Sequence, residues 1–357
     1  MAKLQFHLLS IFSFSLLILV SGVHGGGDHH HHHRRHGRHL FNSRPNKLFV
    51  FGDSYADTGN IQKSLASSWK EPYGITFPGK PSGRFSDGRV LTDYLARFIG
   101  VKSPLPFKWI NHAANNLKYG MNFAFGGTGV FNTLVPLPNM TQQIDIFQKL
   151  MHDQVYSPMD LHSSSAFVSV AGNDYSFYLA TNGSAQGFPD FIRKVVNQTI
   201  ENLKRIQKMG VKKIVVNALQ PLGCLPGITF GSSFRQCNES QNQLVGFHNL
   251  LLKQAVAKLN NETGDSTFLI LDLNTAFFTV FKNKGDRPGS TTFENPLKPC
   301  CVGISSEYSC GDVNVNGTKM YTVCDDPKAT FFWDFVHPTQ EGWRSVYLAL
   351  QANLQQL

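Results

Sequence analysis

Short apolar runs alternate with longer amphipathic segments along most of this chain, and this alternation limits the folds that it can adopt. Five runs have the length and the composition of buried strands: residues 47–51, 119–125, 165–172, 211–219 and 266–273. Five segments carry apolar residues at helical spacing: residues 89–100, 191–210, 239–259, 275–282 and 339–353. Buried strands that alternate with helices favour a parallel sheet covered by helices on both faces. We therefore predict an α/β protein with a central, mainly parallel sheet.

We expect a single folded domain over residues 46–357, because no break in composition and no internal repeat divides this part of the sequence. With 357 residues, 41% of them apolar, the chain is long enough to bury a sizeable core. Residues 283–330 are rich in Gly, Pro, Asn and Cys. We expect a long loop there that cysteine pairs hold in place.

The first 25 residues have the pattern of a cleaved signal peptide. Lys3 supplies a positive start, residues 8–20 form an apolar run, and small residues follow. The run is too short to cross a hydrocarbon core of about 30 Å, and no later run is long and apolar enough to do so. We predict a protein without a membrane span that is secreted, either extracellular or in the cell wall.

Two further features agree with export. Six Asn-x-Ser/Thr sequons are candidate N-glycosylation sites: Asn139, Asn182, Asn197, Asn238, Asn261 and Asn316. Six cysteines are candidate disulfide partners: Cys224, Cys237, Cys300, Cys301, Cys310 and Cys324. An even number of cysteines after a signal peptide favours disulfides over metal ligation. We expect Cys224 to pair with Cys237, and the other four to staple the region before residue 331.

Residues 26–45 contain the segment "DHHHHHRRHGRH" and carry much of the chain's positive charge. A metal-binding or pH-sensitive tail is one interpretation. We favour a disordered spacer, because such a tract cannot bury apolar surface. Its four arginines against Asp28 are compatible with adsorption to an acidic matrix polymer. No basic patch with interleaved aromatic residues predicts a nucleic-acid partner.

Three of the predicted strands are followed by residues that suit acyl-transfer chemistry. Ser54 comes directly after the first strand, in "GDSYADTGN", Gly127 follows the second, and Asn173 follows the third. In open parallel sheets ligands bind at the carboxyl ends of the strands. Each residue alone is more often part of an ordinary turn. Together they offer a nucleophile and two donors for an oxyanion.

Only one histidine of the folded domain has a suitable carboxylate next to it. His337 lies three residues after Asp334, on a loop before the last predicted helix. We expect His152 and His248 on helices, at the surface or in a groove, and His112 and His162 in polar connections. A second Asp-x-x-His pair lies in the tail and is discarded. His337 is therefore the candidate general base, and Asp334 the group that orients it.

The motifs in order resemble those of SGNH hydrolases, and the longer strings resemble the plant secreted GDSL esterase/lipase family. These strings are "FVFGDSYADTGN", "NFAFGGTG", "SVAGNDY", "QPLGCLP" and "FWDFVHPTQEGW". The resemblance covers residues 46–357 and implies a flavodoxin-like, three-layer α/β/α fold. It also implies a nucleophilic Ser54, a base His337 and its partner Asp334. The oxyanion donors would be the backbone N–H groups of Ser54 and Gly127 and the side chain of Asn173.

Two positions depart from the family pattern. Tyr55 stands where the family name has Leu, which we interpret as a neighbouring change without a catalytic role, and Phe125 replaces a residue that is often small. We interpret Asp53 as structural, bonding the turn that aims Ser54.

We predict a serine esterase that cleaves carboxylic esters of lipid, cell-wall or small-metabolite alcohols through an acyl-enzyme. This mechanism needs no metal and no cofactor. An acyltransferase would use the same residues with an alcohol as the acceptor. A secreted binding protein without turnover is a further alternative, but it has no need of the complete set of five residues.

Overall fold

The computed structural model describes residues 45–355 except 113, 265, 284 and 286–290. The predicted signal peptide and almost all of the predicted His/Arg-rich spacer lie outside these residues. In the part of the chain that is described, no helix is long and apolar enough to cross a membrane.

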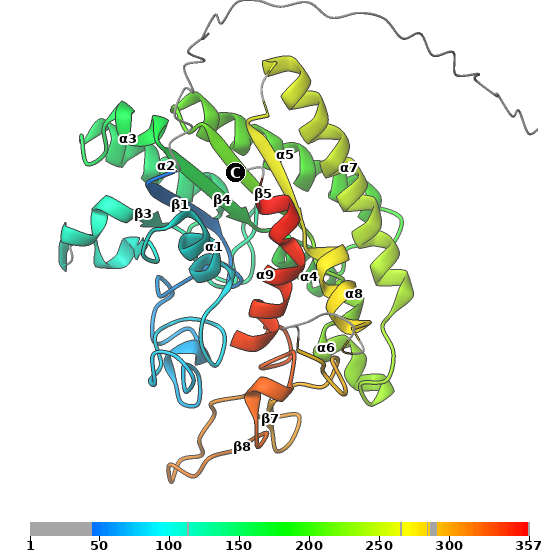
Figure 1. Cartoon of the computed structure of the whole chain (residues 1–357). Coiled ribbons are helices and arrows are strands. Elements are labelled where there is room, and N and C mark those ends of the chain that lie inside the picture. The colour runs from blue at the N-terminus through cyan, green and yellow to red at the C-terminus, as the bar shows by residue number, and fades with distance from the viewer. Residues whose placement is uncertain (1–44, 113, 265, 284, 286–290, 356–357) are drawn as a thin grey trace, which may run out of the picture. The chain divides into compact units, whose positions relative to one another are not determined.

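Six parallel strands form the central sheet, in the order β2-β3-β1-β4-β5-β6 (Figure 1). Their bounds are Lys47–Gly52 for β1, Leu105–Pro106 for β2, Gly120–Asn122 for β3, Ser164–Ser169 for β4, Lys213–Ala218 for β5 and Phe268–Asp272 for β6. Each neighbouring pair is parallel. The predicted α/β fold with a parallel sheet is therefore confirmed.

Helices cover both faces of the sheet, because the central strands have no polar face. Phe49 and Phe51 of β1 belong to one apolar cluster, and Leu48 and Val50 to the other. The first cluster contains residues of α2 (Met140–His152), α5 (Phe188–Lys208) and α7 (Glu239–Thr263). The second contains residues of α1 (Leu91–Ile99), α8 (Leu273–Phe281) and α9 (Gln340–Leu354). The result is three layers, α/β/α.

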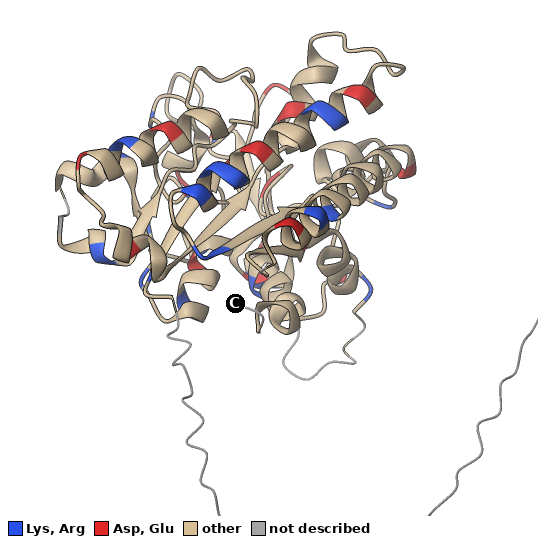
Figure 2. Cartoon of the chain, turned by 90° about the horizontal axis from the view of Figure 1, so that it is seen from above, with Lys and Arg blue, Asp and Glu red and all other residues tan. Residues whose placement is uncertain are grey.

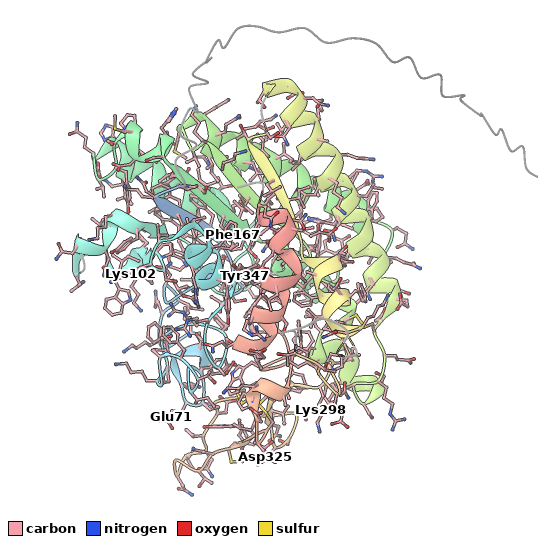
Figure 3. All side chains as sticks on the ribbon, viewed as in Figure 1. Glu71, Lys102, Phe167, Lys298, Asp325 and Tyr347 are labelled. Carbon is pink, nitrogen blue, oxygen red and sulfur yellow. A yellow bond between two sulfur atoms is a disulfide. The ribbon has the colours of Figure 1, made fainter. Side chains whose placement is uncertain are left out.

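Figure 3 labels two residues of the second cluster, Phe167 of β4, which is buried, and Tyr347 of α9, which is partly buried against the cluster. Lys, Arg, Asp and Glu lie mostly on the helices and loops that surround the sheet, with both signs interspersed (Figure 2). Burial of the strands thus agrees with their apolar sequences.

Several elements differ from the sequence-based expectation. The helices α3 (Pro158–His162), α4 (Gly172–Ala180) and α6 (Pro226–Thr229) and the short strand β2 were not among the expected elements, and of α2 only a helix at His152 was expected, without bounds. The strand β3 is also shorter than the predicted 119–125. Beyond its last residue, Asn122, the N–H groups of Phe123 and Phe125 still donate to the carbonyls of Val50 and Gly52 in β1, whereas the N–H of Ala124 donates to the side-chain oxygen of Asn122 at 2.9 Å.

The predicted long loop contains a small stapled unit. Within it, β7 (Cys301–Gly303) and β8 (Tyr321–Val323) form an antiparallel pair. Three disulfides form: Cys224–Cys237, Cys300–Cys324 and Cys301–Cys310. The first pair is the one that we expected, and the other four cysteines staple the region before residue 331 as predicted. Their side chains pack with Tyr73, Tyr321 and Trp333 in a third buried cluster, which we call the cystine cluster.

The order of the strands brings distant residues together. Because β1 lies between β3 and β4, three strands that are separated in sequence end side by side at the centre of the sheet. The strands β2 and β3 lie on one side of β1, and the later strands β4, β5 and β6 lie on its other side. Such a switch point is where open α/β sheets bind their ligands.

Gly52, at the end of β1, has a conformation and a contact that only glycine allows. Its φ is +145°, and a Cβ would lie 2.0 Å from the carbonyl oxygen of Ser169 on β4. We predict that Gly52→Ala lowers the free energy of unfolding by roughly 3 kcal/mol or more. The control is Gly246→Ala, an exposed position of α7 with open space around it. That change should stabilise the protein by about 0.5–1 kcal/mol. Equal effects of the two variants in denaturant unfolding would contradict this account.

Candidate active site

Ser54 lies in a single tight turn directly after β1. The backbone N–H groups of Ala56 and Asp57 both donate to the carbonyl of Asp53, at 3.0 and 2.9 Å. The Asp53 carboxylate accepts the N–H of Tyr55 at 3.0 Å, so Asp53 does bond this turn. Ser54 itself is largely buried, with 7% of its surface exposed. The turn therefore holds the serine hydroxyl in a defined position at the centre of the sheet edge.

A continuous chain of hydrogen bonds connects Ser54, His337 and Asp334. Nε2 of His337 lies 2.8 Å from Oγ of Ser54, and Nδ1 of the same ring lies 2.9 Å from both oxygens of Asp334. Since a carboxylate only accepts, Nδ1 carries the proton in the neutral ring, and Nε2 is the acceptor that faces the serine hydroxyl. This is the arrangement in which an imidazole can take a proton from Ser54.

The carboxylate of Asp334 is buried and has donors on all sides. Its Oδ1 accepts the backbone N–H groups of Val336 and His337, both at 2.8 Å, and its Oδ2 accepts the hydroxyl of Tyr73 at 2.7 Å. Burial raises the pKa of this carboxyl, but the adjacent His337 and the two backbone donors outweigh burial, and the pKa lies below its usual value. Asp334 is thus held ionised, in position to orient and stabilise a protonated imidazole.

The loop that carries His337 is fixed from several sides. The hydroxyl of Tyr55 donates to the carbonyl of Val336 at 2.8 Å, and the N–H of Trp333 donates to the carbonyl of His337 at 2.7 Å. The ring of Phe85 lies against the imidazole, with 4.8 Å between ring centres. Tyr55 was expected to be a neutral replacement for Leu, but its hydroxyl bonds directly beside the histidine. It is therefore part of the support of this loop.

Thr128 ties the ends of the three strands together at the candidate oxyanion site. Its carbonyl accepts the side-chain amide of Asn173 at 2.9 Å, and its hydroxyl lies 3.2 Å from the carbonyl of Gly52. Asn173 stands at the start of α4, after Ala171, whose φ of +102° is strained for a residue with a side chain. No residue pattern in the sequence predicted this backbone conformation, which lies between β4 and α4.

The three candidate oxyanion donors retain free N–H groups. No residue in the described part of the chain accepts a hydrogen bond from the backbone N–H of Ser54 or Gly127. Asn173 uses one of its two amide hydrogens for Thr128 and keeps the other. Polar N–H groups without a protein partner, next to a serine hydroxyl, suit the binding of a negatively charged oxygen.

Three buried aspartates support the strand ends, and only Asp53 was recognised from the sequence. Asp57 accepts four backbone N–H groups, including that of Gly126 at 3.0 Å, and so joins the loop after β1 to the loop after β3. Asp174 accepts the N–H groups of Val130 and Phe131. Burial raises the pKa of Asp53 to about 7 and those of Asp57 and Asp174 to about 6. The Asp-x-Gly-Asn pattern after β1 was the signal that could have identified Asp57 as a turn residue.

The other histidines lie elsewhere. His112 and His152 are exposed, whereas His248, expected at the surface or in a groove, is buried. The prediction for His248 is wrong because its ring nitrogen Nδ1 finds a partner inside the core, the hydroxyl of Tyr175 at 2.6 Å. Burial lowers the pKa of His248 to about 3, so the ring is neutral.

Phe125, the second departure from the family pattern, is buried three residues after β3, and its N–H donates to the carbonyl of Gly52 at 3.0 Å. Among the residues described, no group of three or more His, Cys, Asp or Glu side chains could hold a metal ion. The hydrogen bonds of His337 to Ser54 and Asp334 can support nucleophilic attack and proton transfer by side chains.

The chain matches a known enzyme family over most of its length. The sequence model of the GDSL-like lipase/acylhydrolase family covers residues 48–350. A GDSL esterase/lipase of Arabidopsis thaliana is 66% identical over 318 residues, which are 88% of this chain and 89% of the relative. A second GDSL esterase/lipase of that plant is 59% identical over 320 residues, 89% of this chain and 90% of the relative.

A more distant relative is named for its substrate. Acetylajmalan esterase 2 of Rauvolfia serpentina is 28% identical over 326 residues, which are 84% of this chain and 88% of the relative. The family match includes the segments that carry Ser54, Gly127, Asn173 and His337.

The hydrogen bond from Tyr73 to Asp334 can be tested by stability against pH. Tyr73→Phe should lower the free energy of unfolding near neutral pH by about 1.5–3 kcal/mol, because it removes a donor from a buried charge. Tyr321→Phe, in the same cystine cluster but away from Asp334, is the control. Because the folded pKa of Asp334 is depressed, its ion-pair stabilisation is present above the unfolded pKa and is lost as the pH falls through the folded value. The Tyr73→Phe deficit should therefore shrink in acid, and a deficit that stays constant would refute this assignment.

The raised pKa of Asp53 predicts the opposite trend. Between about pH 4 and 7 the folded protein binds a proton at Asp53 that the unfolded chain has lost, so this group makes stability fall as the pH rises. Asp53→Asn should remove a slope of at most about 1.4 kcal/mol per pH unit in that window. The amide can still accept the N–H of Tyr55. Unfolding curves from pH 4 to 8 measure the effect, with the exposed Asp190→Asn as the control. Parallel curves for wild type and Asp53→Asn would contradict it.

Proposed function

The chain belongs to the GDSL-like lipase/acylhydrolase family and is a hydrolase of ester bonds, and we propose that it works through Ser54, His337 and Asp334. The observation that carries this proposal is the 2.8 Å contact between Oγ of Ser54 and Nε2 of His337, with Asp334 on the other ring nitrogen. A nucleophile, a base and the group that orients the base are thereby in hydrogen-bond reach of one another. The proposed substrate class is carboxylic esters.

In the first half-reaction, Ser54 attacks the ester carbonyl as Nε2 of His337 takes the hydroxyl proton. The C–O bond to the alcohol then breaks, and His337 gives that proton to the leaving alkoxide oxygen, so an alcohol departs and an acyl-Ser54 ester remains. Asp334 stabilises the imidazolium that exists between these two transfers. Its low pKa supports this role, since the carboxylate stays ionised throughout.

The carbonyl oxygen becomes negative when Ser54 attacks. The free N–H groups of Ser54 and Gly127 and the second amide hydrogen of Asn173 are the proposed donors to this oxygen. A single donor of this kind is worth roughly 2.7–4 kcal/mol of transition-state stabilisation where it has been removed in other enzymes. Asn173→Ala should therefore cost roughly 100-fold or more in kcat.

In the second half-reaction, His337 removes a proton from water, which attacks the acyl carbonyl. The acyl C–Oγ bond breaks, the proton returns to Oγ of Ser54, and the carboxylic acid leaves. The net reaction consumes one ester and one water and yields one acid and one alcohol.

We also propose that the protein is secreted after removal of residues 1–25, and that residues 46–357 form the hydrolase domain. Three disulfides support an oxidising compartment. The side chains of the sequon residues Asn182, Asn197, Asn238, Asn261 and Asn316 are exposed, and Asn139 is half-buried, which leaves them accessible for glycans. The proposal includes binding of the basic tail to an acidic polymer.

Ser54→Ala tests the nucleophile. We expect hydrolysis of a short-chain aryl ester to fall roughly 10⁴-fold or more, because no other group can form the acyl intermediate. The chain provides a matched control in its second Gly-Asp-Ser sequence, where Ser266 is exposed and precedes β6. Ser266→Ala should keep full activity. A fluorophosphonate probe followed by peptide mapping should label Ser54, and labelling of a different serine would disprove the assignment.

A further inference from the structure

A cavity lies between α4, α6 and α7, and its lining begins at Tyr175, two residues after Asn173 on α4. Its volume is about 110 Å³. The walls are mostly apolar and include Leu179, Phe188, Leu222, Leu225, Leu244 and Val245. No charged side chain lines it, and the polar members are Tyr175, Ser176 and Gln241. We call this cavity the α4–α7 pocket.

The floor of the α4–α7 pocket is also uncharged. Tyr175 directs its hydroxyl away into the core, where it lies 2.6 Å from Nδ1 of His248. Both residues are buried, and His248 is neutral. The pocket therefore receives the ring of Tyr175 and not a free hydroxyl or a charge. Such a lining offers no charged partner to an ionic ligand, and its only polar side chains besides Tyr175 are those of Ser176 and Gln241.

Two connections join the α4–α7 pocket to the proposed catalytic residues. Asn173 and the pocket residues Tyr175, Ser176 and Leu179 lie on the same helix, α4, and a Cβ at Gly172 would lie 3.7 Å from the side chain of Leu222. On the other wall, the N–H of Gly227 donates to the carbonyl of Phe335 at 2.9 Å. Phe335 directly follows Asp334, and in Figure 1 the helix α6 lies beside the loop that leads to α9.

The chemistry of ester cleavage determines which half of the substrate faces α4. The leaving alcohol takes its proton from His337, so it must lie on the side of the imidazole. The carbonyl oxygen points to the proposed donors, of which Asn173 is on α4. The remaining substituent of the carbonyl carbon, the acyl chain, then lies on the side away from the imidazole, and the lining of the α4–α7 pocket begins two residues after Asn173 on the same helix.

We propose that the α4–α7 pocket binds the acyl chain of the substrate and selects short aliphatic esters. This inference rests on the proposed function. A dry apolar cavity of roughly 150 Å³ is known to hold benzene, so a cavity of about 110 Å³ holds a chain of a few carbon atoms. Leu179 and Ile228 are 53% and 39% exposed, and they form a partly open rim over which a longer chain must extend into water.

This proposal predicts the dependence of hydrolysis on acyl length. With one aryl alcohol as the leaving group, kcat/KM should rise from acetate to butyrate and then stop rising, because further methylene groups leave the pocket. A methylene bound in an apolar pocket is worth roughly tenfold in kcat/KM. Continued gains of that size up to dodecanoate would overturn the proposal.

The variant Leu244→Phe tests whether the acyl chain binds in the α4–α7 pocket. It should fill the pocket and lower the butyrate-to-acetate ratio of kcat/KM at least tenfold. Leu250→Phe is the matched control, since Leu250 lies on the same helix α7 but is 52% exposed and does not line the pocket. Leu244→Ala should have the opposite effect and extend activity to longer acyl chains. Thermal unfolding shows whether each variant is folded.

A second substrate series separates acyl from alcohol binding. Acetates of ethanol, butanol and hexanol vary only the leaving group, and their relative rates should not respond to Leu244→Phe. If this series responds and the acyl series does not, the pocket binds the alcohol and the inference is wrong. Activity that survives Ser54→Ala would instead refute the proposed mechanism. If activity depends on Ser54 but Leu244→Phe leaves the dependence of kcat/KM on acyl length unchanged, only the proposed acyl pocket is refuted.

Discussion

The buried carboxylate of Asp334 is the constraint on which most of the surrounding structure depends. A buried charge without hydrogen-bond partners costs several kcal/mol, so every donor around it has to be held in place. Two donors come from its own loop, one from His337, and one from Tyr73, which lies 261 residues earlier. Tyr73 packs in the cystine cluster, and the N–H of Cys301 donates to the carbonyl of Trp333 at 2.7 Å, next to Asp334. The disulfides therefore stabilise the side of the site that carries the histidine, although no cysteine reaches the serine.

The other side of the site depends on polar side chains that bond to backbone. Asp57 joins the loops after β1 and β3, and the amide of Gln143 on α2 both donates to and accepts from Gly52. These loops leave the sheet at its centre, where buried N–H groups cannot bond to water. The side chains of Asp57 and Gln143 accept hydrogen bonds from them instead. Burial disfavours the ionised form of these carboxylates, and it raises the pKa values of Asp53, Asp57 and Asp174. The same carboxylates that fix the loops at the nucleophile therefore lower the free energy of unfolding near neutral pH.

The sequence predicted those features that depend on local pattern. Apolar runs predicted the parallel sheet, and helical spacing predicted α1, α5, α7, α8 and α9. The positions of Ser54, Gly127 and Asn173 after their strands, and of His337 beside Asp334 before the last helix, suggested one site. The supporting residues were not predictable in this way. Tyr73, Gln143 and Asp174 act through partners 261, 91 and 44 residues away, and nothing in their neighbourhood in the sequence marks them. His248 was misplaced for the same reason, because its burial depends on Tyr175, 73 residues earlier.

Tyr55 shows how a change within a motif can add a contact without changing the chemistry. Its ring packs edge-on against Trp343 of α9, with 5.0 Å between ring centres, and its hydroxyl reaches the carbonyl of Val336. A leucine at this position would keep the apolar contact but would leave that carbonyl without this donor. The turn that aims Ser54 and the loop that carries His337 are therefore joined directly, one residue away from each functional side chain. Proton transfer requires that Ser54 and His337 stay within hydrogen-bond distance of each other. The bond from Tyr55 to Val336 constrains this distance.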